Sequence, residues 1–276
     1  MRLLTLDLEL ARRIEHAEAQ AAVECAEALK RFRPASGAAV RRVAGGFAVY
    51  CGKNSPITQA VGMGLDGAVT PREFDTLEDF YRGCGEAVRV ETCPLADPTF
   101  IELFGQRGYR VTEFSNVLAR PVSPDDAWPA PAGGIAIEKA GKDRIDLWTQ
   151  TVAQGFADQF PVSQELLETM KMFALAPKTE LYLASVDGKV AGGGTLALHD
   201  GVAGLFGAST LPVARRQGVQ TALLQRRLAR AAQAGSDLAV SLAQPGSTSQ
   251  RNISRQGFRV LYTRVKFEKD FAKPAS

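Results

Sequence analysis

The sequence predicts an α/β (α+β) protein in which two similar halves follow one another. Its 276 residues exceed the roughly 100–200 residues of a typical domain. Residues 121–134 contain four prolines and end in two glycines, a composition that neither a helix nor a central strand accepts. We therefore expect a first domain, a linker and a second domain, at residues 1–121, 122–133 and 134–276.

The two halves end in the same pattern of helix, glycine, aromatic residue and strand. Residues 104–114 read FGQRGYRVTEF and residues 253–263 read ISRQGFRVLYT, so that Gly108 matches Gly257 at a separation of 149 residues. Such a repeat indicates an internal duplication. The alternative is coincidence, because a helix that ends at glycine and precedes a strand is common.

The second half alternates strand and helix patterns in the order β-α-α-β-β-β-α-β-α-β. Asp-Gly pairs at 187–188 and 200–201 separate apolar runs, which is typical of hairpins. The predicted helices are residues 143–157, 163–174, 219–235 and 247–256. The predicted strands are residues 134–138, 181–186, 189–199, 201–210, 237–242 and 259–268.

The first half shows a similar but thinner pattern. A long amphipathic helix is expected at residues 8–32, followed by shorter elements. The shorter helices are expected at residues 71–81 and 100–106, and the strands at residues 46–51, 58–64 and 87–91.

An Arg-x-x-Gly loop joins the strand pattern at 201–210 to the helix that begins at Val219. Gly218 lets the backbone bend and approach a ligand closely. The first turn of the helix directs unpaired N–H groups and the positive end of the helix dipole at an anion. Arg215 and Arg216 add positive charge, so the loop suggests a site for the pyrophosphate of a large anionic cofactor.

Residues 215–220, RRQGVQ, resemble the Arg/Gln-x-x-Gly-x-Gly/Ala signature of the GCN5-related N-acetyltransferase (GNAT) family, and Pro212 also fits. The closing helix, the Gly257-Phe258 turn and the sequence after it are similar as well, so the resemblance covers residues 134–269. It implies two tandem acyl-CoA N-acyltransferase (GNAT) domains, each a mixed, mostly antiparallel sheet flanked by helices. Gln220 departs from the small residue of the signature.

The resemblance implies an acyltransferase of class EC 2.3.1.- that moves the acetyl group of acetyl-CoA directly to an amine. The acceptor would be a small molecule or a peptide, and no metal is expected. The implied cofactor-binding residues are Ala208, Ser209, Thr210, Arg215, Arg216, Gln217, Gly218, Val219, Gln220, Thr221 and Asn252. Arg226 and Arg230 either reach the phosphate of the nucleotide or form a solvated helix face.

The first half has no Arg-x-x-Gly loop at the equivalent position, where residues 70–76 read TPREFDT. Glu73 and Asp75 fall in the first turn of the predicted helix, where they would repel a pyrophosphate. We therefore interpret the first half as a degenerate copy.

The acceptor amine must lose a proton before it attacks. At pH 7 this costs about 4.6 kcal/mol for a lysine-like amine, so a base, a water relay or a desolvating pocket is expected. The strand at 201–210 has no Glu. His199 titrates in the right range, but beside the Asp200-Gly201 turn we expect it to be exposed. Asp158 is a second candidate, or an ordinary loop residue.

The resemblance places the usual general acid, a tyrosine, at position 253, which is isoleucine here. The nearest polar residues are Asn252, Ser254 and Tyr262, of which Asn252 best suits a cofactor hydrogen bond. Either another residue supplies the proton or the thiolate leaves with little acid help, since its pKa is near 8.5. A non-catalytic acetyl-CoA sensor or scaffold is therefore the alternative function.

Composition narrows the partners further. The 33 basic and 30 acidic residues leave a net charge of only +3, which does not favour nucleic acid or membrane binding. The sequence contains neither an apolar span nor a signal core, so we expect a cytoplasmic monomer or homodimer. Four cysteines without CxxC spacing are expected to be reduced and packed. Gly192-Gly193-Gly194 lies in a hairpin strand and does not form a Rossmann fingerprint.

Overall fold

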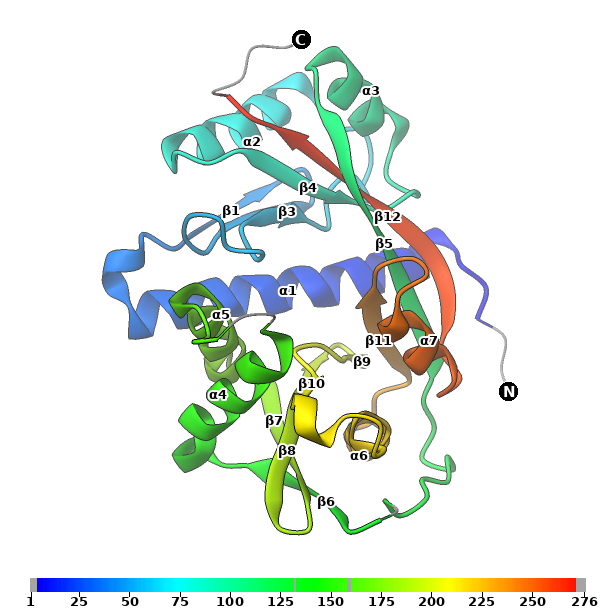
Figure 1. Cartoon of the computed structure of the whole chain (residues 1–276). Coiled ribbons are helices and arrows are strands. Elements are labelled where there is room, and N and C mark those ends of the chain that lie inside the picture. The colour runs from blue at the N-terminus through cyan, green and yellow to red at the C-terminus, as the bar shows by residue number, and fades with distance from the viewer. Residues whose placement is uncertain (1–3, 132, 158–159, 272–276) are drawn as a thin grey trace.

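The computed structural model describes residues 4–131, 133–157 and 160–271, and these form one 12-stranded mixed sheet with helices on both faces (Figure 1). The order along the sheet is β1 (Ala39–Val43), β2 (Gly46–Tyr50), β3 (Gln59–Val61), β4 (Val88–Thr92), β12 (Arg259–Lys269), β5 (Arg110–Pro121), β11 (Leu238–Ala243), β9 (Val202–Gly204), β8 (Lys189–His199), β7 (Thr179–Val186) and β6 (Ile135–Ala140). The short strand β10 (Ser209–Thr210) also pairs with β8.

The last strand of each half is inserted into the sheet of the other half. β12 lies between β4 and β5 of the first half, and β5 lies between β12 and β11 of the second half. The two strands pair antiparallel, with Arg110 opposite Glu268 and Ala119 opposite Arg259. A shift of 149 positions exchanges these two pairs, which supports the duplication. The division at residues 121 and 134 stays a prediction, because the strands of the two halves interleave.

Seven α-helices of the described residues cover the sheet. They are α1 (Leu8–Phe32), α2 (Pro71–Gly83), α3 (Pro98–Gln106), α4 (Ile145–Phe156), α5 (Gln164–Leu175), α6 (Val219–Gln233) and α7 (Thr248–Ser254). The expected helix at residues 8–32 is confirmed as α1, which begins where the Asp7 carboxylate accepts the Leu10 N–H at 2.8 Å.

The helix α1 ties the two halves together. It crosses the middle of the molecule and packs against β2 of the first half and against β8, β9 and α5 of the second (Figure 1). Arg13 at its start bonds Asp237 at 2.6 Å, and Arg33 just past its end pairs with Glu168. A helix from the first half therefore forms part of the second half's surroundings.

Successive residues of β8 point to opposite faces of the sheet, and their neighbours show which helices cover each face. A Cβ placed on Gly193 would meet Val152 of α4 at 2.8 Å, whereas one on Gly194 would meet Arg227 of α6 at 3.0 Å. Ala197 and His199 share the side of Gly193, and they lie under α1. Thus α1 and α4 cover one face and α6 covers the other. The glycine run permits this close approach.

Two strand predictions were incomplete. The expected strand at 201–210 is broken into β9 and β10, because residues 205–208 leave the regular ladder. The strand β1 was not predicted; it joins β2 through Ala44 and Gly45, both with positive φ. The proline-rich segment is coil after Pro121, as expected, and the Arg120 guanidinium stacks over the Trp128 ring near its start.

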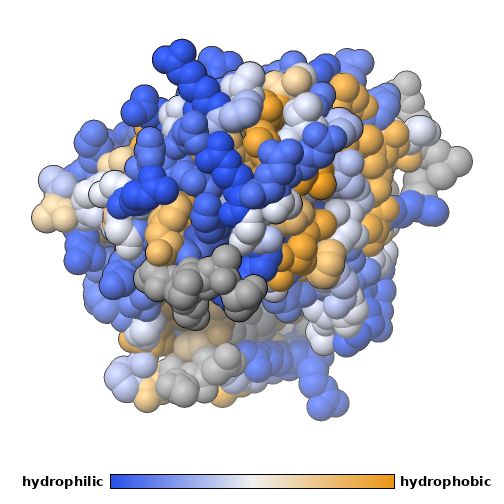
Figure 2. All heavy atoms as spheres, turned by 90° about the horizontal axis from the view of Figure 1, so that it is seen from above, coloured by the Kyte–Doolittle hydropathy of each residue, from blue (hydrophilic) through white to orange (hydrophobic). Residues whose placement is uncertain are grey.

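Seen from the end that carries α2 and α3, the surface is mostly hydrophilic, and its apolar side chains gather toward α3 and β5 (Figure 2). The exposed residues Ile101, Val111 and Phe114 belong to these elements. This end lies opposite α6 (Figure 1), so the apolar surface is separate from the predicted cofactor loop. No described helix combines the length and apolarity needed to cross a bilayer.

Candidate functional site

A gap opens in the sheet where β9 and β11 part. The two strands run parallel as far as Gly204 and Val240. The last backbone hydrogen bond is the Leu205 N–H donating to the Val240 carbonyl at 2.8 Å, and the Ser241 hydroxyl donates to the Leu205 carbonyl at 2.9 Å. Beyond it the chain turns toward β8, where Ser209 lies opposite Gly193. Among the described residues, β10 has no strand on its other edge. We call the space between β10 and β11 the strand gap.

In residues 208–210 the backbone groups alternate in direction, so that some face β8 and the others face the strand gap. Leu211 N–H donates to the Ala191 carbonyl at 2.8 Å, so Ser209, two residues earlier, also bonds toward β8. The amides of Ala208 and Thr210 therefore point to the open edge. The Ser209 hydroxyl is buried and donates to the Val152 carbonyl at 2.8 Å, so its side chain is structural.

The N-terminus of α6 is uncapped. Gly218 precedes it with φ of +90° and no side chain closes the first turn. The first helical bond is from Ala222 N–H to the Gly218 carbonyl, at 3.0 Å, which leaves the N–H groups of Val219, Gln220 and Thr221 without helical acceptors. We call residues 215–221 the α6 cradle.

The arginines of this region differ in their contacts. Arg215 donates to the Gly155 carbonyl at 3.2 Å and to the Thr210 carbonyl at 3.5 Å, which fixes the cradle next to the strand gap. Arg216 and Arg226 are exposed. Arg230 instead pairs with Glu180 at 2.8 Å, about 16 Å beyond the helix start at 1.5 Å per residue. The structure thus places Arg230 away from the cradle.

Asn252 lies beside the cradle. Its Nδ2 donates to Oε1 of Gln220 at 2.8 Å, and its Oδ1 accepts from Arg255 at 3.1 Å. The Gln220 side chain is therefore held toward α7. Its neighbour Ile253 is buried in the core, so the position of the expected tyrosine has a packing role.

Tyr262 does not face the strand gap. Its hydroxyl is buried and donates to Oε1 of Glu15 on α1 at 2.7 Å, and burial raises its pKa. Two strands, β5 and β11, separate β12 from the gap. Asp158, the other loop candidate, lies outside the described residues.

The expectation that His199 is exposed was wrong. Its side chain is only 3% exposed, because α1 covers the end of β8. Neither ring nitrogen has a hydrogen-bond partner among the described residues, and Nε2 lies 3.8 Å from Oε2 of Glu24. Burial lowers the pKa of His199, so the neutral imidazole is favoured at pH 7.

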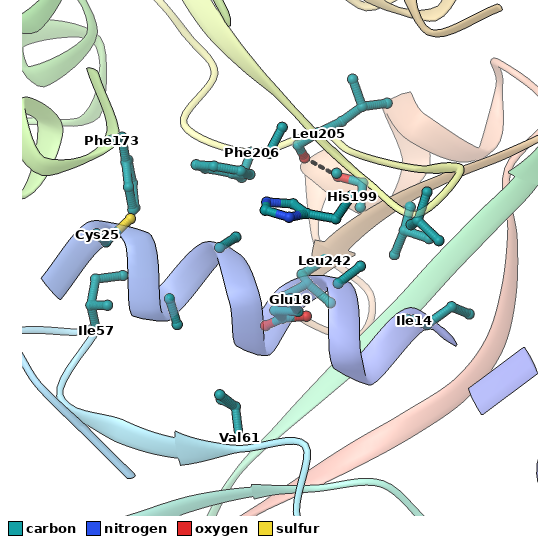
Figure 3. Close-up of a pocket in the computed structure, with 18 of the residues that line it drawn as sticks. Ile14, Glu18, Cys25, Ile57, Val61, Phe173, His199, Leu205, Phe206 and Leu242 are labelled. Carbon is teal, nitrogen blue, oxygen red and sulfur yellow. Dashed lines mark hydrogen bonds between the residues drawn. The ribbon is translucent and has the colours of Figure 1, made fainter. Parts of the chain in front are cut away.

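His199 lines a cavity of about 220 Å³, the central cavity, between α1 and the strands β8, β9 and β11 (Figure 3). Most of its wall is apolar. The polar side chains on it are those of Glu18, Gln59, His199 and Ser241. We did not predict Glu18 as a site residue, although a carboxylate amid the apolar residues at 14, 17, 21, 22 and 25 of one helix face was a signal.

Two buried arginines were also missed. Arg264 pairs with Glu15 at 2.8 Å and with Glu18 at 2.7 Å, and burial raises the pKa of Glu18 despite this pairing. Arg227 of α6 donates to the carbonyls of Thr195 in β8 and Leu223 in α6. Burial lowers the Arg227 pKa to about 10.

Comparison with solved structures places this fold among the acetyltransferases. A GCN5-related N-acetyltransferase from Kribbella flavida superposes with a TM-score of 0.64 and 17% identity, over 91% of this chain and 95% of that one. A second, from Sphaerobacter thermophilus, gives 0.57 and 18%, over 84% and 75%. A tandem GNAT protein from the clavulanic acid biosynthesis pathway gives 0.57 and 12%, over 84% and 75%.

These identities show the fold alone. No curated protein matches the sequence. The sequence of residues 146–258, however, matches the model of the acetyltransferase (GNAT) family, and this span contains the α6 cradle, the strand gap and Asn252. The C-terminal half of the chain therefore contains a domain of the acetyltransferase (GNAT) family.

Proposed function

We propose that the C-terminal half binds acetyl-CoA and transfers its acetyl group directly to a primary amine of a small molecule or peptide. The observation that carries this proposal is the meeting of an uncapped helix end with an open strand edge. The α6 cradle offers N–H groups to the pyrophosphate, and the strand gap beside it offers the amides of Ala208 and Thr210 to the pantetheine arm. Arg215 contacts both parts.

The chemistry needs few side chains. The neutral amine attacks the thioester carbonyl and a C–N bond forms. The C–S bond then breaks to release CoA thiolate, and the proton that the nitrogen sheds passes to water or to the thiolate. A backbone N–H in the strand gap would stabilise the charge on the carbonyl oxygen. Because Ile253 carries no acidic proton and the Tyr262 hydroxyl is buried against Glu15, two strands from the gap, we propose that the thiolate leaves without a dominant acid.

Calorimetry and an acceptor screen test this function. We expect one acetyl-CoA per chain, and release of the CoA thiol with a subset of amino acids, aminoglycosides, polyamines, peptide N-termini and simple alkyl or aryl amines. Absence of acetyl-CoA binding, or two equivalent sites per chain, would contradict the proposal.

The absence of an acid at position 253 also favours a second candidate, an acetyl-CoA sensor or scaffold. Binding of one acetyl-CoA without thiol release for any amine class would support it.

A further inference from the structure

We propose that the central cavity is the acceptor site, that it takes a primary amine carrying a compact apolar group, and that His199 removes the proton of that amine. This inference rests on the proposed acetyl transfer, and it assigns the substrate class and the base.

The position of the cavity supports an acceptor site. Leu205, Val240 and Ser241 line it, and hydrogen bonds from Leu205 to Val240 and from Ser241 to Leu205 mark the point where the chain after β9 parts from β11. The cavity lies on the α1 face of β8, whereas the α6 cradle lies on the opposite face. An acetyl group that enters the strand gap from the α6 side would therefore meet an amine held on the α1 side.

The size and lining of the cavity indicate the kind of amine. A dry protein cavity of about 150 Å³ holds a benzene molecule, so about 220 Å³ has room for a phenyl ring and one or two methylenes. Ile57, Val61 and Phe173 make its walls apolar. A polyamine or a sugar would lose hydrogen bonds to water that these walls do not replace.

His199 has the geometry of a proton acceptor. In Figure 3 its imidazole lies within the cavity, over α1, and both nitrogens are without partners in the described part of the chain. A neutral imidazole keeps one lone pair free for a proton. A desolvating cavity also favours the neutral form of the amine itself.

The charged groups around His199 do not take over this role. Glu24 and Glu18 face it from α1, and Lys178 and Asp200 lie at the ends of the neighbouring strands. The Glu18 carboxylate is held by Arg264 at 2.7 Å. The Glu24 carboxylate accepts the Lys178 backbone N–H at 3.2 Å. Each of these carboxylates is thus engaged through one oxygen, whereas neither nitrogen of His199 has a hydrogen-bond partner in the described part of the chain.

The proposal also gives the first half a role. The helix α1 and residues 57, 59 and 61 come from that half, and they form one side of the cavity. A half without a cofactor cradle would then supply the acceptor wall of its neighbour.

The base is tested with His199→Ala and with 2-phenylethylamine as the acceptor. We expect kcat to fall by about 10² to 10⁴ while the affinity for acetyl-CoA is unchanged. Added imidazole should restore part of the rate. In the unaltered protein kcat should rise with pH as the imidazolium deprotonates below pH 6.5, and this limb should vanish in the variant. An unchanged kcat and pH profile would exclude His199 as the base.

The acceptor site is tested with Ala21→Leu, which fills the cavity from α1, and with Gln20→Leu as the matched control outside the cavity wall. We expect Ala21→Leu to raise the KM for this amine at least tenfold and to weaken binding of its N-acetyl product, with acetyl-CoA affinity intact. Gln20→Leu should change neither.

Two outcomes separate this proposal from the proposed function. Acetylation of spermidine or an aminoglycoside in preference to 2-phenylethylamine would overturn the acceptor class and leave acetyl transfer standing. Failure to bind acetyl-CoA would overturn acetyl transfer, and calorimetry with N-acetyl-2-phenylethylamine alone would still decide whether the cavity takes an apolar amide.

Discussion

The N-termini of α6 and α2 follow equivalent points of the two halves but have opposite chemistry. The helix α6 begins after Gly218 with no side-chain cap. The helix α2 is closed by a capping box, in which the Glu73 carboxylate accepts the Thr70 N–H at 2.9 Å and the Thr70 hydroxyl oxygen accepts the Glu73 N–H at 3.3 Å. Pro71 contributes no N–H at all.

This comparison shows how a helix start that is open in one half is closed in the other half of a duplicated chain. The end of α2 already holds a carboxylate of its own, so its positive dipole end is neutralised from within the chain. The end of α6 has no such cap and stays open to the pyrophosphate that we propose it binds. In the first half a threonine, a proline and a glutamate, all common at helix starts, suffice to close the helix end.

Gly218→Val breaks the comparison at α6 and should have the largest effect. A β-branched residue is strained by about 1–2 kcal/mol at φ of +90°, although its Cβ would find only Ile135 at 3.6 Å. That strain lowers stability, whereas loss of one charged hydrogen bond to the pyrophosphate costs about 1.5–3 kcal/mol of binding free energy, so acetyl-CoA affinity should fall about 10- to 100-fold by calorimetry.

The matched control is Gly235→Val, at the other end of the same helix, where φ is +80° and the space is open. Its acetyl-CoA affinity should be unchanged, although it is similarly destabilised in thermal unfolding. Equal loss of affinity in both variants would show that strain, and not the cradle, is responsible.

Tyr262→Phe extends the comparison of the two halves to their last strands, β5 and β12. At the equivalent position of β5 stands Glu113, which pairs with Lys266 at 2.9 Å near the surface, whereas Tyr262 is buried against Glu15. We expect turnover to fall by much less than the factor of about 10² to 10⁴ of a general acid. Unfolding stability should fall by about 1–3 kcal/mol because Glu15 loses a buried donor. A thousandfold loss of turnover with intact CoA affinity would identify Tyr262 as the acid.

Glu73→Ala sharpens the comparison at α2 and should have the smallest effect. Loss of the cap should lower the free energy of unfolding by about 1 kcal/mol, with acetyl-CoA stoichiometry still one per chain.

The hydrogen bonds to Thr70 lower the pKa of Glu73, so the contribution of Glu73 to stability is present above the unfolded pKa and is lost as the pH falls through the lower folded pKa. Urea unfolding at pH 7 and well below pH 4 should therefore show the difference only at pH 7, and Glu102→Ala is the exposed control. A second acetyl-CoA site in the variant would show that the cap alone blocks binding.

Local chemistry allowed much of this protein to be predicted. The helix α1, the Asp-Gly hairpins and the uncapped start of α6 each depend on neighbouring residues, and all lie where the sequence pattern placed them. The family signature is local too, since six consecutive residues, 215–220, carry it. The sequence also predicted that Glu73 lies in the first turn of α2, where it would repel a pyrophosphate, and the capping box places it there.

Tertiary structure alone decided what surrounds the site. The exchange of β5 and β12 pairs residues about 150 positions apart, and no local pattern specifies that pairing. His199 was misjudged because its burial depends on α1, nearly 200 residues earlier in the chain. The same packing brings Glu18 to Arg264 and closes the central cavity. Sequence by itself predicted the helix end at which we propose that an anion binds, because a helix end is a local feature, whereas the proposed acceptor side depends on elements of both halves that meet only in the tertiary structure.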